Sequence, residues 1–449
     1  MKKCCFAGWI AVLSVFLLPL AAFAGGFAVN EQGAKATGMA NAFAAQADDP
    51  SAVYFNPAGI VQLDGTQVSI GSSVVIPNAK FESNTNDPTF RNTSPGQTTN
   101  LDNKAVVVPN AYLTQKVNDS ISFGFGTFSN FGLETNWPDD WPGRYLVGGT
   151  KAELSTLSVN PVLAFKPHKR FSLAVGPVMQ YLDFDLRRQQ FTPPPNTQPD
   201  AKFSGDDVDW GWNAALMVWI TDDIKFGASY RSPVSHRING KLDFGPQVAA
   251  LNLRNTTLTA NIKTPANAYL GLAWNHGPLT LEFDAQWTNW SSFSELSAKF
   301  NRAVGAGTTG LAVEEDWHDA WGYRFGAQYA VNQYLDVRAG IAYDESPIPS
   351  RSVSPGQALL DPLVQIQGWQ TTDSHPRFPH VSRPLSRFTH LLFRNFWLEF
   401  FEELTHLKRL WICSVIPCRS WLEETRASSI QLIYSVASGI QQNLIPQRK

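Results

Sequence analysis

The chain has 449 residues, which is enough for one large barrel or for two to three globular domains. Its formal net charge of −2 provides no bulk basicity that would favour nucleic acid as a partner. The mean hydropathy of −0.18 excludes a bundle of membrane-spanning helices but not a membrane barrel, because the inward half of a barrel wall is polar.

Residues 1–24 have the pattern of a cleaved secretory signal peptide. Two lysines precede an apolar run at 6–20, and an A-x-A cleavage site follows at 22–24. The alternative is an N-terminal membrane anchor, but the run is short for a spanning helix. We therefore expect an exported protein. No later run of 18 apolar residues predicts a transmembrane helix.

Residues 25–66 are rich in small side chains and have too few large apolar residues to form a core of their own. The segment must therefore pack inside something else or stay mobile. It contains a turn at Asn56, Pro57 and Ala58. Pro57 fixes φ wherever it stands, so a plain turn is the alternative to a specific role.

Residues 67–349 contain eleven strand-length stretches in which apolar and polar side chains alternate, as they do along a strand. In the stretch from residue 279, Leu281 and Phe283 point one way, whereas Glu282 and Asp284 point the other. One wholly apolar face suits a barrel wall in lipid, where charge costs roughly 2–4 kcal/mol at mid-bilayer. A soluble β-sandwich is the alternative. The predicted strands are 67–80, 105–117, 120–128, 150–165, 171–189, 206–220, 224–245, 256–275, 279–293, 317–331 and 335–345.

The two faces of this predicted wall differ in their side chains. We expect the apolar face to meet lipid at Phe226, Tyr230, Phe283, Phe325 and Ile341. We assign the charged residues of the other face to the lumen. They are Asp183, Asp185, Arg187, Arg231, Arg324 and Arg338. Acidic groups in a lumen disfavour a free carboxylate ligand unless neighbouring arginines offset them.

Residues 350–449 break the pattern of the wall. They lose the alternation, and residues 351–449 hold only 3 of the chain's 32 glycines. A globular C-terminal domain is one interpretation. We favour translation in a shifted frame after about residue 349, with about three further strands in the correct frame. A wall without them would leave unpaired backbone groups in hydrocarbon.

The sequence predicts no enzyme. The four histidines at 168, 236, 276 and 318 are scattered over turns, strands and loops, and no serine partner is implied by their spacing. The pair at Cys413 and Cys418 has no second pair or histidine cluster nearby, so we expect no metal site and no cofactor.

Four segments in order give a family resemblance over residues 25–349. They are GGFAVNEQGA…ADDPSAVYFNPAGI at 25–60, FSNFGLETNW at 128–137, YRSPVSHRINGKLDF at 230–244 and WGYRFGAQYAVNQYLDVRAGIAYDESPIP at 321–349. Together they resemble the outer-membrane long-chain fatty-acid transporter family (FadL type). The chain departs from that family in showing eleven strands where fourteen are expected, and the likeness ends within 346–356.

The resemblance implies a fourteen-stranded barrel whose lumen is closed by residues 25–66, the hatch, anchored at Asn56, Pro57 and Ala58. It implies a kink in the third strand near Asn130, Phe131 and Gly132, through which ligand leaves sideways. An ordinary turn at the end of that strand is the alternative. The kink is physically reasonable, because glycine relaxes the backbone and a kink breaks strand pairing.

The implied function is passive transport of hydrophobic molecules, either long-chain fatty acids or aromatic hydrocarbons. The expected protein is a monomer in the lipid of the bacterial outer membrane, and no nucleic acid is expected as a partner. Two alternatives remain. One is a structural or adhesive barrel with a permanently plugged lumen, and the other is a truncated, non-functional transporter.

Overall fold

The structure is a computed structural model that describes most of the chain between residues 25 and 349. The described residues are 25–76, 79–82, 98–102, 104–190, 199–245, 253–305 and 307–349, with the backbone alone of 365–371 and 440–444. The expected signal peptide and most of the tail at 350–449 lie outside them. The chain divides into two units, of which one, residues 375–428, is wholly outside the described part.

The hatch contains three short helices. They are α2 (Ala34–Thr37), α3 (Ala52–Phe55) and the 3-10 helix η1 (Pro57–Gln62). Asn56 begins η1, because its side-chain oxygen accepts the N–H of Ala58, and Pro57 lies at the first helical position. The side chains of these helices are mostly buried, and they pack against inward-facing residues of the wall. Within the described residues, no helix is both long and apolar enough to cross a membrane.

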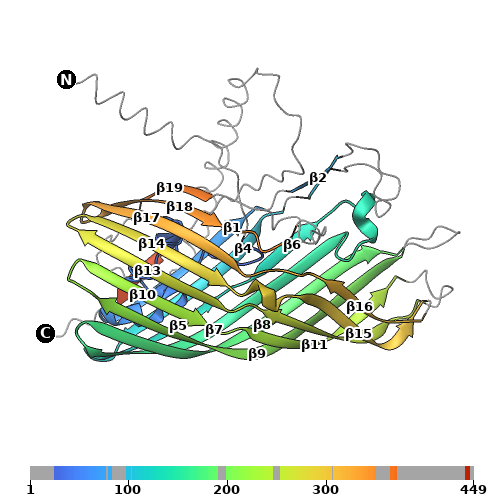
Figure 1. Ribbon diagram of the computed structural model, residues 1–449, viewed down its shortest axis with the longest axis horizontal. Coiled ribbons are helices and arrows are strands. Elements are labelled where there is room, and N and C mark those ends of the chain that lie inside the picture. Colours follow the sequence, from blue (N-terminus) through green and yellow to red (C-terminus); the bar gives the residue numbers. More distant parts are fainter. Residues whose placement is uncertain are drawn as a thin grey trace, which may run out of the picture. The chain divides into compact units, whose positions relative to one another are not determined.

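The wall is an antiparallel sheet of long strands, and β7, β8 and β9 lie side by side in it (Figure 1). Its first half comprises β1 (Thr66–Val75), β4 (Val106–Lys116), β5 (Ile121–Phe128), β6 (Gly132–Asn136), β7 (Lys151–His168), β8 (Phe171–Gln189), β9 (Asp200–Trp219), β10 (Ile224–Arg231) and β11 (Val234–Phe244). Its second half comprises β12 (Thr256–Thr264), β13 (Asn267–His276), β14 (Leu279–Thr288), β15 (Glu295–Val304), β16 (Thr308–Glu314), β17 (Ala320–Asn332) and β18 (Leu335–Asp344).

The order of neighbours follows the chain as far as β9, where it divides into two branches, and β6 pairs with β7 beyond the end of β5. From β1 the pairing runs through β4, β5, β7, β8 and β9. One half of β9 pairs with β10, which continues through β13, β14, β17 and β18. The other half pairs with β11, which continues through β12, β15 and β16.

Shorter elements complete the described structure. Two tail segments join the wall by their backbones, β19 (Gln365–Thr371) beside β18 and β20 (Ile440–Leu444) beside β1. The remaining elements are a small separate sheet of β2 (Lys80–Glu82) and β3 (Thr98–Asn100), and the 3-10 helices η2 (Pro142–Tyr145) and η4 (Trp290–Ser292).

The predicted all-β, antiparallel architecture is confirmed, and each of the eleven predicted strands coincides with strand in the structure. Two predicted strands are each divided by a proline. Pro233 separates β10 from β11, and Pro265 separates β12 from β13. Proline lacks the N–H that a ladder needs, so the chain can change partners there. The pair β15 and β16 lies between the predicted strands 279–293 and 317–331, where no strand was predicted.

The outward direction of the predicted lipid face is confirmed where the strands are most exposed. Phe283, Phe325 and Ile341 expose between 43% and 49% of their surface, whereas Glu282 and Arg324 expose 1% and 2%. Phe226 and Tyr230 are half-buried. The period-two pattern therefore gives the correct face for the central part of the wall.

The assignment of Asp183, Asp185 and Arg187 to the lumen was wrong. On β8 they are an even number of residues away from the exposed Leu173 and Val175. Because side chains alternate along a strand, they lie on the same, outer face. Leu182 and Phe184 are buried in a core cluster on the inner face. The reason is that the inner face is itself apolar along this part of β8, so apolar character does not identify the lipid side there. On the outer face, Asp185 forms ion pairs with Arg187, Lys151 and Lys202.

Candidate functional site

Four aromatic side chains gather around Phe27, near the start of the hatch. The centre of the Phe27 ring lies 4.7 Å from that of Trp290, 5.3 Å from Phe293 and 5.8 Å from Phe131. Trp317 completes the group at 5.7 Å. These five residues, the aromatic cluster, expose at most 8% of their surface and belong to a larger apolar core. Such a surface suits the body of a hydrophobic ligand.

The sequence pattern predicts only part of the aromatic cluster. Phe131 was predicted to lie near the kink, whereas Trp290 and Trp317 fall near the ends of the predicted strands 279–293 and 317–331. In the structure they are buried, whereas Trp287 and Trp321 pair across β14 and β17, with Trp321 exposed. The alternation of a strand stops at its last residue, so it does not predict which way the next tryptophan turns.

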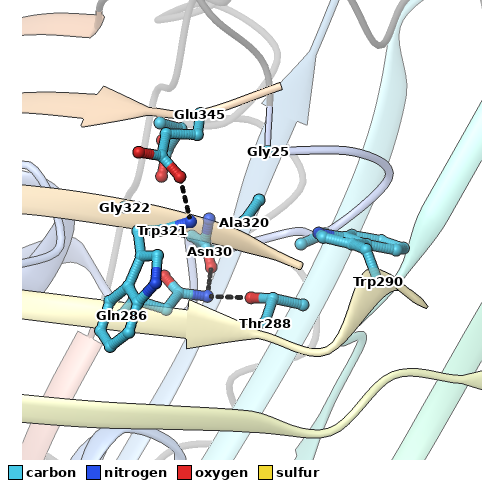
Figure 2. A pocket seen from close by; sticks show the side chains of 11 residues that line it. Gly25, Asn30, Gln286, Thr288, Trp290, Ala320, Trp321, Gly322 and Glu345 are labelled. Carbon is cyan, nitrogen blue, oxygen red and sulfur yellow. Dashed lines mark hydrogen bonds between the residues drawn. The ribbon is translucent and has the colours of Figure 1, made fainter. Parts of the chain in front are cut away.

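A small pocket lies beside the aromatic cluster, between the hatch and the ends of β14 and β17. Figure 2 shows Gln286 between Asn30 and Thr288, with its amide nitrogen 3.3 Å from the Asn30 side-chain oxygen. Trp290 lines the same pocket. The volume of this pocket, about 10 Å³, suits one water molecule rather than an acyl chain. A larger ligand would therefore need the hatch to move.

The wall changes register at residues 129–131, the kink. Phe128, the last residue of β5, pairs with Ser158, whereas Gly132, the first residue of β6, pairs with Ser155. Three residues therefore stand opposite two on β7, which is the arrangement of a β-bulge. This places Asn130, Phe131 and Gly132 at a local break in the wall. Their role in ligand exit stays a prediction.

Side chains of β7 hold the kink in place. The Thr156 hydroxyl lies 2.8 Å from the Phe131 carbonyl oxygen and 3.1 Å from its backbone nitrogen. The Ser158 hydroxyl donates to the Asn130 side-chain oxygen at 2.8 Å. Asn130 is 2% exposed, and its amide nitrogen has no hydrogen-bond partner.

The start of the hatch pairs with the kink as a short strand would. The N–H of Gly132 donates to the Phe27 carbonyl at 3.0 Å, and the N–H of Val29 donates to the Asn130 carbonyl at 2.9 Å. These bonds take up backbone groups that β7 leaves unpaired at the bulge. The same few hatch residues therefore fill the centre of the aromatic cluster and line the break in the wall.

Two carboxylates on β14 hold the middle of the hatch. Asp284 accepts the N–H groups of Phe43 and Ala44 at 2.8 and 2.9 Å. Glu282 accepts those of Ala45 and Gln46 at 2.6 and 3.0 Å. Both side chains are buried, so these hydrogen bonds lie away from water. The alternation pattern placed both residues in the lumen but did not reveal this function.

The turn at Asn56, Pro57 and Ala58 contacts both the hatch and the wall. The Asn56 amide nitrogen donates to the carbonyl of Ala44 at 2.6 Å and to that of Leu216 on β9 at 3.1 Å. The Ser172 hydroxyl on β8 donates to the Ala58 carbonyl at 2.7 Å. These contacts support the predicted anchor, whose role in function stays a prediction.

Charge within the hatch is partly balanced locally. The Lys35 ammonium lies 2.7 Å from a carboxylate oxygen of Asp48. Burial raises the pKa of Asp48, but it is outweighed by the attraction and hydrogen bond of Lys35 together with the attraction of Lys225 and the hydrogen bond of Gln46. The pKa of Asp48 therefore lies below its usual value. The neighbouring Asp49 differs, since burial raises its pKa above the usual value even though it accepts hydrogen bonds from Ser51.

Of the four arginines predicted to face the lumen, three are buried, namely Arg231, Arg324 and Arg338. Arg324 pairs with Asp344 at 2.9 Å, and Arg338 pairs with Asp336 at 2.8 Å. Arg231, at the end of β10, lies against the hatch, where it donates to the Tyr54 carbonyl at 3.3 Å.

One histidine has an acidic partner that the sequence analysis missed. His236, on β11, is 2% exposed and lies 3.2 Å from Asp207 and 3.1 Å from Gln180. The hydrogen bonds of its ring go to these two residues and not to a serine, so they do not form a nucleophilic triad. Within the described residues, no group of three histidine, cysteine or acidic side chains could hold a metal ion.

Comparison with known proteins identifies relatives of this chain. A family model described as "Outer membrane protein transport protein (OMPP1/FadL/TodX)" matches residues 15–355. A long-chain fatty acid transport protein of Escherichia coli O6:H1 is 28% identical over 400 residues, which cover 79% of this chain and 85% of the relative. A 47 kDa outer membrane protein of Pasteurella multocida is 28% identical over 338 residues, which cover 69% and 76%.

Solved structures share the fold. A FadL homologue from Pseudomonas aeruginosa has a TM-score of 0.61 at 22% identity and covers 74% of this chain and 83% of its own. The toluene transporter TodX of P. putida has a TM-score of 0.57 at 16% identity and covers 75% and 87%. The match to the family model extends over about three quarters of the sequence. The chain therefore belongs to the OMPP1/FadL/TodX family of transport proteins of the bacterial outer membrane.

Proposed function

We propose that this protein lets hydrophobic molecules cross the outer membrane passively, and that its ligands are long-chain fatty acids or aromatic hydrocarbons. Relatives in the family are named as fatty acid transporters, and structures of the same fold are toluene transporters. Ligand would enter the aromatic cluster and leave sideways through the kink. The hatch would be the part that moves.

The observation that carries this proposal is the double role of Phe27. Its ring occupies the centre of the aromatic cluster, and its carbonyl accepts the N–H of Gly132 at the kink. A ligand that displaces the ring together with the backbone of Phe27 would strain or break that bond. Occupation of the apolar site is thereby coupled to the break in the wall.

Deleting Asn130 tests the lateral route. The deletion removes the extra residue of the bulge, so that two residues between β5 and β6 stand opposite two residues of β7. The strand β5 can then continue into β6 along β7. We expect cells that lack other such transporters to lose uptake of oleate and toluene through this variant. Asn130→Ala is the matched control, because it removes the side chain but keeps the register. Uptake equal to wild type in the deletion variant would refute the lateral route.

The same assay addresses the alternative of a permanently plugged, structural barrel. The four hydrogen bonds from the hatch to Glu282 and Asp284 are the observation that favours it. A wild-type protein that is folded and inserted, yet takes up neither ligand, would support that alternative and refute the proposed transport.

A further inference from the structure

A chain of hydrogen-bonded side chains runs along the inner face of the wall from the kink to a histidine on β11. The Ser158 hydroxyl donates to the Asn130 side-chain oxygen at 2.8 Å, and it accepts the amide nitrogen of Gln180 at 3.3 Å. The Gln180 side-chain oxygen lies 3.1 Å from Nε2 of His236. These four residues, the relay, expose at most 2% of their surface. The relay therefore connects the kink with a buried titratable group.

The register of the strands brings the members of the relay together. Ser158 on β7 stands opposite Gln180 on β8, and Gln180 stands opposite Asp209 on β9. Side chains that stand opposite one another on neighbouring strands are close enough to touch. The relay therefore crosses the wall from strand to strand, at right angles to the chain direction.

The relay ends where the backbone ladder of the wall is interrupted. β9 pairs with β10 as far as Asn213, and it pairs with β11 only from Ser204 onwards. Between these two positions the described wall has no register pair of β9 with either strand. His236 and Asp207 lie in this interval, with Nδ1 of the ring 3.2 Å from a carboxylate oxygen. Here a contact between side chains takes the place of a ladder.

The direction of the hydrogen bonds decides where the protons lie. Because Gln180 donates with its nitrogen to Ser158, its oxygen faces His236, and an amide oxygen only accepts. Nε2 of His236 therefore donates. Nδ1 faces a carboxylate oxygen of Asp207, which also accepts. The ring thus donates at both nitrogens, which is the arrangement of a protonated histidine.

Loss of this proton reverses the relay. A neutral ring with its hydrogen on Nδ1 turns a lone pair at Nε2 towards the Gln180 oxygen, and two buried acceptors that face one another are costly. When the Gln180 amide turns over, its oxygen takes the hydroxyl hydrogen of Ser158. The Asn130 oxygen then loses its donor. In the described structure the Asn130 amide nitrogen has no partner, so the bond from Ser158 is the one that holds this side chain.

The neighbours of the ring allow both protonation states. Two carboxylates act on it, those of Asp207 and Asp209, and both belong to β9. The partners from β8 and β12 are neutral, since Gln180 contacts the ring and Thr264 donates to the same Gln180 oxygen at 2.9 Å. Burial disfavours the charged ring, whereas the two carboxylates favour it. The charge of His236 therefore depends on a balance between opposing effects.

We infer that His236 is a positioning residue for the kink: its protonated ring holds Asn130 through Gln180 and Ser158, and loss of its proton loosens this break in the wall. The inference deepens the proposed function, because the kink is the proposed exit, and it rests on that function for the effect on transport. The effect on the kink itself is measured separately from uptake.

Hydrogen exchange in the purified full-length protein tests the inference. The amides of Val29, Phe131 and Gly132 report on the kink, because all three donate hydrogen bonds there. Their rates, corrected for intrinsic exchange, are compared from about pH 5 to pH 8, the interval in which histidine normally changes charge. We expect exchange about twofold to tenfold faster at the high end, the range for one hydrogen bond. The midpoint should coincide with the titration of the His236 ring, followed by NMR.

Two variants separate the relay from general destabilisation. Ser158→Ala cuts the relay and should give the faster exchange at every pH. His236→Gln keeps a side-chain N–H donor but has no proton to lose, so it should keep the slower exchange at every pH. Thr156→Ala is the matched control, because Thr156 lies on the same face of β7 and bonds Phe131 outside the relay. It should speed exchange and leave the pH dependence as in wild type.

The outcomes decide between a relay and a purely structural role. A wild-type protein whose corrected exchange does not change with pH overturns the inference, as does a wild-type pH dependence that persists in Ser158→Ala or in His236→Gln. If His236→Gln does not fold, Ser158→Ala decides. Uptake is a separate measurement, since a wild-type protein that takes up neither oleate nor toluene refutes the proposed function without altering the exchange result.

Discussion

Glu282 and Asp284 stand two residues apart on β14 and together accept four consecutive backbone N–H groups of the hatch. The spacing of two puts both carboxylates on the inner face, one above the other along the strand. Glu282 accepts one N–H group with each of its two oxygens, whereas Asp284 accepts both of its N–H groups with Oδ2. The hatch is therefore attached at its middle by hydrogen bonds as well as by packing.

Asp284→Ala should loosen the hatch. It leaves the N–H groups of Phe43 and Ala44 buried without an acceptor, at roughly 1–3 kcal/mol each. We expect faster hydrogen exchange at these two amides and a higher conductance for small ions in planar bilayers. Asp284→Asn keeps an oxygen at the same place and should have a much smaller effect. Unchanged exchange in the alanine variant would contradict the attachment.

Asn56→Asp should open the hatch more than Asn56→Ala does, although aspartate is the closer match in shape. The aspartate keeps the oxygen that accepts the Ala58 N–H, but it turns an oxygen towards the carbonyls of Ala44 and Leu216. Buried acceptors facing one another are more costly than a lost bond. Ion conductance should be higher for Asn56→Asp than for Asn56→Ala. The reverse order of conductance would show that the amide donors of Asn56 are unimportant.

The ion pair of Lys35 with Asp48 predicts a dependence on pH. The pKa of Asp48 lies below its usual value in the folded protein. Its contribution to hatch stability is therefore present at neutral pH and is lost as the pH falls through that lowered pKa. We expect Asp48→Asn to raise ion conductance at pH 7, and the difference from wild type to vanish in acid.

Replacement of Asp49 should have the opposite effect on conductance to replacement of Asp48 in the same experiment. Its pKa is raised by burial, so the charged form at neutral pH opposes the closed hatch. Asp49→Asn should therefore lower conductance at pH 7 or leave it unchanged. A rise in conductance from Asp49→Asn equal to that from Asp48→Asn would mean that the two carboxylates act through packing alone.

The sequence predicts the wall better than it predicts the lumen. Period-two alternation identifies a strand such as β8 to the residue, because one face must be apolar in lipid. It fails at Asp183 and Leu182, where the inner face is apolar as well. Contacts such as Asp284 with Phe43 join residues 241 positions apart, and no local pattern records them.

The expected frame shift near residue 350 stays a prediction, because most of that tail lies outside the described residues. Only the backbones of β19 and β20 are placed, beside β18 and β1. The nucleotide sequence around codon 350 would test it. A second reading frame should encode about three alternating strands ending in an aromatic residue, and a normal heat-modifiable gel mobility of the present chain would argue for a real C-terminal domain.

Gly26→Ala should break the contact between the hatch and the kink. Gly26 has a φ of +66°, and an added Cβ would lie 2.5 Å from the Trp290 ring. Trp290 is fully buried among Phe27 and Phe131, so its ring cannot turn aside. The backbone at Phe27 must move instead, which would break its bond to Gly132. We expect faster hydrogen exchange at Gly132 and Val29.

The variant Gly65→Ala separates the effect of backbone strain from the effect of a steric collision with Trp290. Gly65 has nearly the same φ, +64°, but an added Cβ meets nothing within 4 Å. That variant should carry only the conformational strain of a left-handed residue, roughly 1–2 kcal/mol. Exchange at Gly132 should then match wild type. Equal acceleration in both variants would mean that general destabilisation, and not the contact of Gly26 with Trp290, governs the kink.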